Sequence, residues 1–324
     1  MSLNRTSRMF LTRTWQNGVW YAFNIYIYFW MVTGVAGSAL SVIVLFRVRR
    51  AIDACSFQYL VPLAFSDSIF VVTFSMKSLE RIHIVAGNVQ GKYMFFAISD
   101  VSCKLGMVLI NFGIKTSSWV LLCFAIERSV AVLAPLQVGR LVTRARRRYL
   151  VLSISVYFTI TEGAMSGQFY VKTLHGHDDS ITRNCQTYML ASILTKVKIV
   201  YSIAVTIIIP LSGFAVSTAL IASQFSRRDA RFKNTYTSEQ ERRCVRNLIC
   251  IVVAYFLFNM PNTAFMILQA TSSVLSRLPV HMLHFSSLLS GVLMITNSGV
   301  NFFIYVVNLK LFRDELTRLM FGIR

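Results

Sequence analysis

The chain has 324 residues, of which 55% are hydrophobic and only 14% charged, and its formal net charge is +20. Soluble domains contain about 25% charged residues, so this balance favours an integral membrane protein over a soluble enzyme or binding domain. The basic residues form short clusters between apolar runs rather than lining a polar groove, and we therefore expect no nucleic-acid partner.

Seven apolar runs follow one another along the chain, at residues 20–46, 57–78, 99–134, 149–168, 197–223, 245–272 and 281–307. A bilayer core is crossed by about 20 apolar residues, so each run is long enough for one transmembrane helix. The predicted fold is all-α, a seven-transmembrane helix bundle over residues 20–307. These helices and their loops leave no room for a catalytic domain, so we expect no enzyme. We also expect no cofactor, apart from the allosteric sodium ion considered below.

The first apolar run exceeds the core of a signal peptide, which has about 7 to 15 residues, and is interpreted as the first transmembrane helix. Residues 1–19 then form a short N-terminal segment outside the membrane. Asn4 begins the acceptor sequence Asn4-Arg5-Thr6 for N-glycosylation, a modification made only on the extracellular side.

Clustered arginines and lysines occupy alternate loops, those after the first, third and fifth runs. By the positive-inside rule these loops are cytoplasmic, because the opposite loops carry only scattered positive charge. With seven helices the N-terminus is then extracellular, and we expect a multi-pass protein of the plasma membrane. The clustered residues are Arg47, Arg49, Arg50, Arg140, Arg144, Arg146, Arg147, Arg148, Arg227, Arg228, Arg231, Lys233, Arg242 and Arg243.

The second apolar run contains Asp67, and a carboxylate at bilayer depth costs about 2.5–3.5 kcal/mol on an insertion scale. Oxygen groups around one buried carboxylate suit a monovalent cation better than Ca²⁺, which predicts an allosteric sodium site. One alternative is a protonated Asp67 in a structural hydrogen-bond network. A second is an ion pair with Lys115, which lies about 200° around its helix from Ser117. The neutral polar groups available to Asp67 are Ser117, Asn297, Ser298 and Asn301.

The third run has a distinctive residue at each end. Arg128 follows Cys103 by 25 residues, a helical rise of about 37 Å. Glu127 precedes the arginine, and Glu241 opens the sixth helix on the same inner side. Arg128 and Glu241 are therefore a candidate switchable ion pair, with an arginine that merely extends to the interface as the alternative. Among the six cysteines only Cys103 and Cys185 fall on the expected outer side, so we expect one disulfide.

Pro210 and Pro261 interrupt the fifth and sixth runs, where each removes a backbone N–H and kinks its helix. The kinks are candidate hinges, with static packing kinks as the alternative. After the seventh run, residues 308–324 have an apolar face and a charged face. This pattern predicts a cytoplasmic amphipathic helix on the inner leaflet, and a frayed continuation of the seventh helix is the alternative.

Together these residues resemble the rhodopsin-like (class A) family of G-protein-coupled receptors. Pro261 stands in a segment that corresponds to the family's CWxP, and Cys103 and Cys185 match its disulfide. The last motif also has some similarity to invertebrate receptors of the FMRFamide type. The matching segments are Leu63-Ala64-Phe65-Ser66-Asp67, Glu127-Arg128-Ser129, Pro135-Leu136, Phe258-Asn259-Met260-Pro261, and Asn297-Ser298-Gly299-Val300-Asn301-Phe302-Phe303-Ile304-Tyr305 followed by Phe312-Arg313.

Several positions depart from the family's pattern and indicate a divergent member. Asn259 stands where the family has the Trp of its rotamer switch, and Thr218 stands where it has the fifth-helix Tyr. The remaining departures are Ser38 and Pro62 for Asn, Ser129 for Tyr, Phe302 for Pro, and the absence of a Trp from the fourth run. The predicted sodium-site set is intact.

The resemblance implies a receptor that transmits the binding of an extracellular ligand to a heterotrimeric G protein, with the lipid bilayer as its environment. It implies that Glu127, Arg128, Glu241 and Tyr305 form the inactive-state lock and the coupling surface. The alternatives are an orphan chemosensory receptor of the same fold, and a transporter or channel that uses Asp67 as its ion site.

The resemblance also bears on the ligand. Ile110 stands where amine receptors of the family have an Asp, which counts against an amine. A long second outer loop and acidic residues favour a basic neuropeptide, with solvated loop charges as the alternative reading of those acids. The acidic residues are Glu80, Asp100, Glu162, Asp178 and Asp179. The implied pocket comprises Glu80, Asp100, Ile110, Asn111, Asn259, Asn262 and Gln269.

Overall fold

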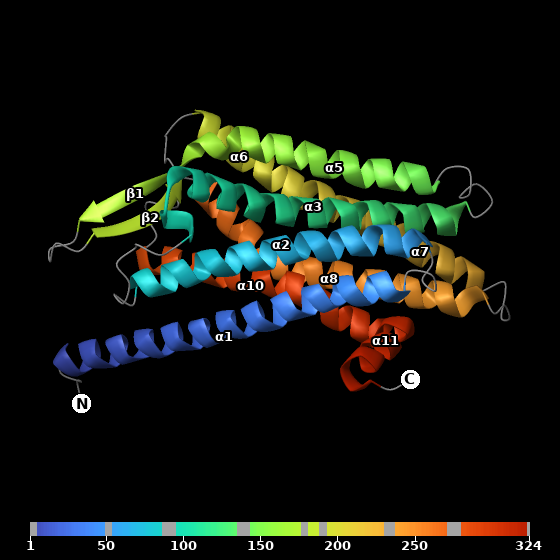
Figure 1. The fold of residues 1–324 in the computed structure, drawn as a ribbon, viewed down its shortest axis with the longest axis horizontal. Coiled ribbons are helices and arrows are strands. Elements are labelled where there is room, and N and C mark those ends of the chain that lie inside the picture. Colours follow the sequence, from blue (N-terminus) through green and yellow to red (C-terminus); the bar gives the residue numbers. More distant parts are fainter. Residues whose placement is uncertain are drawn as a thin grey trace.

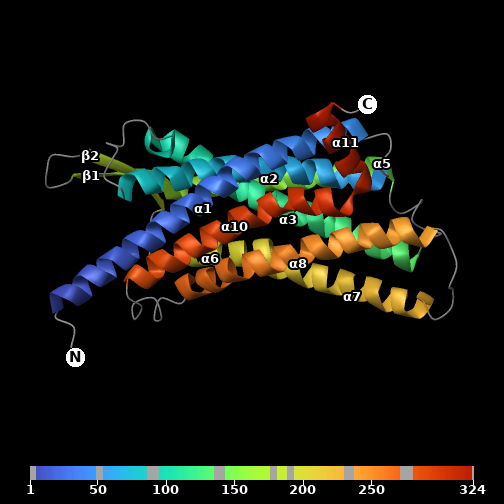
Figure 2. The same cartoon turned by 90° about the horizontal axis from the view of Figure 1, so that it is seen from below.

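Long helices run side by side in one elongated bundle (Figures 1 and 2). The computed structural model describes the chain in eight segments. They are residues 5–48, 54–85, 95–134, 143–175, 181–187, 193–229, 237–270 and 280–322.

The helices of the bundle follow the seven apolar runs. Within the described residues, six stretches are long and apolar enough to cross a membrane, and Ile249–Phe265 adds a shorter one. The predicted all-α seven-helix bundle is therefore confirmed. In chain order the helices are α1 (Arg5–Arg47), α2 (Ala54–Val85), α3 (Asp100–Leu133), α5 (Arg144–Met165), α6 (Ile193–Ile203), the π-helical η4 (Ala204–Ile208), α7 (Ile209–Asp229), α8 (Thr237–Ala270), α10 (Val280–Asn308) and α11 (Lys310–Phe321).

The first helix is longer than its apolar run. It begins at Arg5, whereas its membrane-crossing stretch begins only at Ile25. No proline occurs between these residues or later in α1, so nothing in the backbone chemistry ends the helix where the polar residues begin. The polar residues 5–19 thus extend α1 beyond the apolar run.

A β-hairpin replaces the loop predicted between the fourth and fifth runs. Its strands β1 (Phe169–His175) and β2 (Ile181–Thr187) are antiparallel, and Val171 lies opposite Cys185. Short 3₁₀ turns, η2 (Phe95–Ala97) and η3 (Ser166–Gln168), lie near its base. The hairpin and the start of α1 project from one end of the bundle, and α11 lies at the other (Figure 1).

The largest hydrophobic cluster fills the half of the bundle nearer α11. It includes Leu63, Phe124, Phe214 and Tyr305, which come from four different helices. Phe312 of α11 is fully buried in the same cluster, and its ring centroid lies 5.9 Å from that of Tyr305. Because α10 ends before an extended residue and α11 then turns back onto the bundle, the predicted amphipathic C-terminal helix is a separate element.

Candidate functional site

Asp67 on α2 is only 2% exposed and lies at the junction of three helices. Ser117 of α3 donates from Oγ to Asp67 Oδ1 at 2.7 Å, and Asn301 of α10 donates from Nδ2 to Oδ2 at 2.7 Å. Hydrogen bonds to a carboxylate offset part of the cost of burying it. Asp67 therefore links α2, α3 and α10 near the middle of the bundle.

A small internal cavity lies beside this network. Asn297 and Ser298 of α10 line it together with Ser117, and it has room for little more than a water-sized particle. Hydroxyl and amide oxygens next to one carboxylate fit a small monovalent cation. All five residues of the predicted sodium site thus gather at one place. The other residues of the cavity wall are Phe70, Ile114, Ser118, Tyr255, Asn259 and Met294.

Lys115 does not pair with Asp67, so that alternative from the sequence is wrong. Its ammonium forms a buried ion pair with Glu162 of α5, and the two side chains are 4% and 2% exposed. The ring of Tyr201 on α6 lies over the ammonium, with its centroid 5.1 Å from Nζ. The physical reason is the helical period, which turns Lys115 away from Ser117 and towards α5 and α6.

The fifth membrane helix is distorted just before Pro210. Proline has no N–H, so the carbonyl of Thr206 loses the α-helical donor that position 210 would normally supply. In the π-helical turn the N–H of Ile209 donates to Ala204 O, so it is not available to the carbonyl of Val205. Side chains of neighbouring helices supply donors instead. Trp119 Nε1 of α3 donates to Val205 O at 2.8 Å, and Tyr255 Oη of α8 donates to Thr206 O at 2.5 Å. The π-helical turn η4 is therefore attached to two other helices.

Tyr255 also connects this distorted segment with α3. Ser118 Oγ donates to Tyr255 Oη at 3.0 Å, and Asn259, one turn further along α8, donates to the Tyr255 carbonyl at 2.9 Å. Asn259 and Tyr255 both line the cavity beside Asp67. Asn259 thus occupies the predicted position in α8, next to Pro261, and places an amide where the family has an indole.

Near the C-terminal end of α3, Glu127 is 5% exposed and connects α3 with α2 and α5. Tyr59 of α2 donates from Oη to Glu127 Oε2 at 2.9 Å, and Arg147 Nε of α5 lies 2.9 Å from Oε1. The neighbouring Arg128 has its guanidinium carbon 5.3 Å from the centroid of the Phe124 ring. A buried carboxylate shared by a guanidinium and a phenol fixes the base of α5 against α2 and α3.

The two other members of the predicted lock are Glu241 and Tyr305. The side chain of Glu241 lies outside the described residues, so its pairing with Arg128 stays a prediction. Tyr305 is 1% exposed, and no hydrogen-bond partner for its hydroxyl occurs in the part of the chain that the structure describes. A buried hydroxyl without a partner is unfavourable in this conformation.

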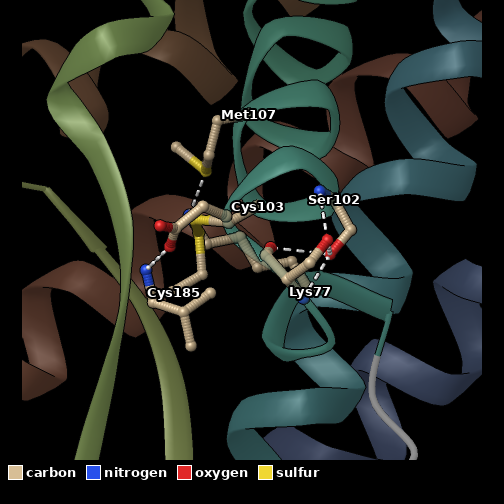
Figure 3. The surroundings of a disulfide bond; sticks show 8 residues. Lys77, Ser102, Cys103, Met107 and Cys185 are labelled. Atoms are coloured by element: carbon tan, nitrogen blue, oxygen red, sulfur yellow. Dashed lines mark hydrogen bonds between the residues drawn. A yellow bond between two sulfur atoms is a disulfide. The ribbon is translucent and has the colours of Figure 1, made fainter.

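The predicted disulfide between Cys103 and Cys185 is present and joins α3 to the hairpin, with the two Cα atoms 5.5 Å apart. Figure 3 shows it beside Met107, whose sulfur lies 2.7 Å from Lys77 Nζ of α2. The N–H of Val171 donates to Asp100 Oδ1 at 2.7 Å. The hairpin is thus held to the start of α3 by one covalent bond and one hydrogen bond to a carboxylate.

The residues of the predicted ligand pocket are not all available to a ligand. Ile110 is 6% exposed and packs in a hydrophobic cluster with Phe70 and Phe96. Asn111 donates to the carbonyl of Met107 on its own helix. Asn262 is half-buried. The side chains of Glu80 and Gln269, and the residues Asp178, Asp179 and Asn4, lie outside the described residues.

Two of the acidic residues assigned to a basic ligand have partners within the protein, but only Glu162 is buried, whereas Asp100 is exposed. Asp100 accepts a hydrogen bond from the hairpin backbone, and Glu162 is buried against Lys115. The expectation that Glu162 faces the ligand is therefore wrong, because an acid inside an apolar run pairs with the nearest buried cation. The signal was available in the sequence, since Lys115 and Glu162 are ionisable residues of opposite sign within two adjacent apolar runs.

Sequence comparison gives an independent result for the whole chain. The profile of the family described as "7 transmembrane receptor (rhodopsin family)" matches residues 38–305. Formyl peptide receptor-related sequence 4 of Mus musculus is 22% identical over 98% of this chain and 94% of its own length. Growth hormone secretagogue receptor type 1 of Oryctolagus cuniculus is 23% identical, over 89% and 78%. The FMRFamide receptor of Drosophila melanogaster is 27% identical, over 85% and 49%.

Proposed function

Because the chain belongs to the rhodopsin family of seven-transmembrane receptors, we propose that it transmits the binding of an extracellular peptide to a heterotrimeric G protein. The observation that carries the proposal is the family match over residues 38–305. The matched region includes both buried carboxylates described above, Asp67 and Glu127. Proteins of this family are receptors and not enzymes, and the chain is a multi-pass membrane protein. We place its N-terminus outside the cell, because the positive-inside rule assigns the loops with clustered arginines and lysines to the cytoplasm.

The names of the relatives support a peptide ligand. Two of them are named for peptides, formyl peptide and FMRFamide. The hairpin tied to α3 by Cys185 also supports it, since this lid-like element borders the outer end of the bundle where a peptide would enter. A transporter or channel is not favoured, because none of these relatives is one.

The mechanism requires two conformations that bind the ligand with different affinity, since a ligand with equal affinity for both shifts no equilibrium. In the conformation described, α3 is held to α2 and α5 through Glu127, and to α2 and α10 through Asp67. We propose that the ligand favours a form in which these contacts loosen and the inner ends of the helices separate. Arg128 and the basic loops would then contact the G protein.

We further propose that Asp67 is the centre of a sodium-sensitive switch. Asp67 supplies the negative charge and Ser117 a hydroxyl oxygen. The amide of Asn297 and the hydroxyl of Ser298 lie on the adjoining cavity. A cation bound here would favour the form that keeps α2, α3 and α10 together. Agonist affinity must then fall as sodium rises, because coupling between two sites is reciprocal.

The receptor proposal is tested by expressing the chain in cells and recording calcium and cAMP responses to a peptide library. A peptide that activates it should lose its effect on an Arg128→Ala variant present in equal amount at the cell surface. A full response from that variant would contradict the assigned role of Arg128. A receptor that answers only non-peptide odorants would contradict the peptide proposal.

The sodium proposal is tested by agonist binding in sodium chloride and in an equal concentration of a large organic cation, which keeps ionic strength constant. Asp67→Asn preserves the shape of the side chain and removes its charge. It should abolish the sodium effect while leaving surface expression intact. Identical agonist binding in the two salts for the unmodified receptor would contradict the sodium proposal and leave Asp67 only a structural or protonation role.

A further inference from the structure

The first turns of α5 carry four arginines within five residues, in the sequence Arg144-Ala145-Arg146-Arg147-Arg148, with no acidic residue among them. Arg147 turns inward, is 9% exposed and is neutralised by Glu127. Arg144 and Arg148 are exposed. Positive side chains this close together repel one another, and the positive end of the helix dipole adds to that cost.

The inward position of Arg147 fixes where the neighbouring side chains lie. At 3.6 residues per turn, Arg144 and Arg148 lie about 40° apart on one outward face, one turn above the other. The same row continues along the helix to Leu152 and Val156, which are 59% and 48% exposed. A cationic segment thus passes directly into an apolar one along a single side of α5.

This side of α5 faces the surroundings of the bundle. Only 17% of the membrane-crossing window of α5 is buried inside the protein, against 56% for α2 and for α3. Figure 1 shows α5 along the edge of the bundle. The apolar part of the row therefore borders the acyl chains, and the arginines lie where the headgroups begin, on the side that the positive-inside rule assigns to the cytoplasm.

We propose that Arg144 and Arg148 bind the headgroup of an inner-leaflet phospholipid that carries a phosphomonoester, with its acyl chains along Leu152 and Val156. The proposal rests on the orientation given under the proposed function. A phosphomonoester presents about two negative charges and three acceptor oxygens, and guanidinium groups bind phosphate oxygens through two parallel hydrogen bonds. The two arginines match the negative headgroup of such a lipid, and the apolar residues that follow them match its acyl chains.

Native mass spectrometry of the purified full-length receptor measures the affinity for individual lipids. The probes are phosphatidylinositol bisphosphate, phosphatidic acid, phosphatidylserine and phosphatidylcholine. The test variant is Arg144→Gln/Arg148→Gln. The matched control is Lys172→Gln/Arg183→Gln. It also removes two positive charges, but from exposed positions on the hairpin at the other end of the bundle. Thermal unfolding of both variants confirms that each is folded.

The test variant should bind the two phosphomonoester lipids at least about tenfold more weakly, whereas the control should bind them like the unmodified receptor. Undiminished binding by the test variant would overturn the proposal, as would an equal loss in the control or phosphatidylserine bound as tightly as phosphatidylinositol bisphosphate. A test variant that keeps its lipid but loses coupling to the G protein would assign the two arginines to the transducer surface instead.

Discussion

Removing the carboxylate of Glu162 should destabilise the receptor more than any other single change of charge proposed here. Glu162→Gln leaves the ammonium of Lys115 buried between α3, α5 and α6 without its counter-charge. Breaking a buried ion pair on one side costs about 3–5 kcal/mol. The Tyr201 ring lies over the ammonium both before and after the change, so its contribution cancels and the loss of stability should be about 3–5 kcal/mol.

Such a loss is measurable as thermal unfolding in detergent with a thiol-reactive dye. Cys123 and Cys250 are free and only partly exposed, so they report unfolding. A midpoint at least about 5 °C lower is expected for Glu162→Gln. The control is Glu315→Gln, which breaks pairs with Arg47 and Arg318, whose side chains are 56% and 66% exposed; an exposed pair contributes about 0–1 kcal/mol.

A second variant separates an unpaired charge from lost packing. Lys115→Met/Glu162→Met removes both charges and keeps side chains of similar length, and it should recover most of the stability. If the double variant were as unstable as Glu162→Gln, or if Glu162→Gln unfolded at the same temperature as Glu315→Gln, the buried pair would not have the energetic role assigned to it.

Three further substitutions test other contacts by thermal unfolding. Tyr255→Phe should destabilise by about 1–3 kcal/mol, because it leaves the carbonyl of Thr206 buried without a donor; unchanged stability would contradict the role of this hydroxyl. Tyr305→Phe should be neutral or stabilising, since it removes a hydroxyl without a partner among the described residues; a loss of stability would mean that the hydroxyl is bonded. Gly106→Ala should destabilise by about 1–3 kcal/mol, because its Cβ would lie 2.1 Å from Cε1 of the fully buried Phe96; a variant that unfolds like the unmodified receptor would refute this.

The sequence predicts the bundle well because each membrane helix has a long apolar run, and the bilayer sets its length. It also predicts that Asp67, Ser117 and Asn301 meet, since a carboxylate at bilayer depth needs polar partners. It does not predict the helical start at Arg5, where polar residues carry no hydrophobic signal. It does not predict the β-hairpin either, where the sequence indicated only a long outer loop.

Two contacts that the sequence did not predict depend on how neighbouring helices are rotated and packed. Lys115 and Glu162 are separated by 47 positions, and which of several buried acids a lysine meets depends on the rotation of its helix. The attachment of Tyr255 to Thr206 depends on the missing N–H of Pro210 and on the packing of α8 against the fifth helix. The proline was visible in the sequence, but its consequence required the neighbouring helix.

The separation between Lys115 and Glu162 also matters while the protein is being made. The ribosome releases Lys115 47 residues before its partner, so α3 enters the bilayer with an uncompensated ammonium that costs about 2.5–3.5 kcal/mol. Its mean hydropathy of 1.6 must outweigh that cost until α5 arrives. Insertion of the fourth membrane segment is thus the step that neutralises the ammonium in the third.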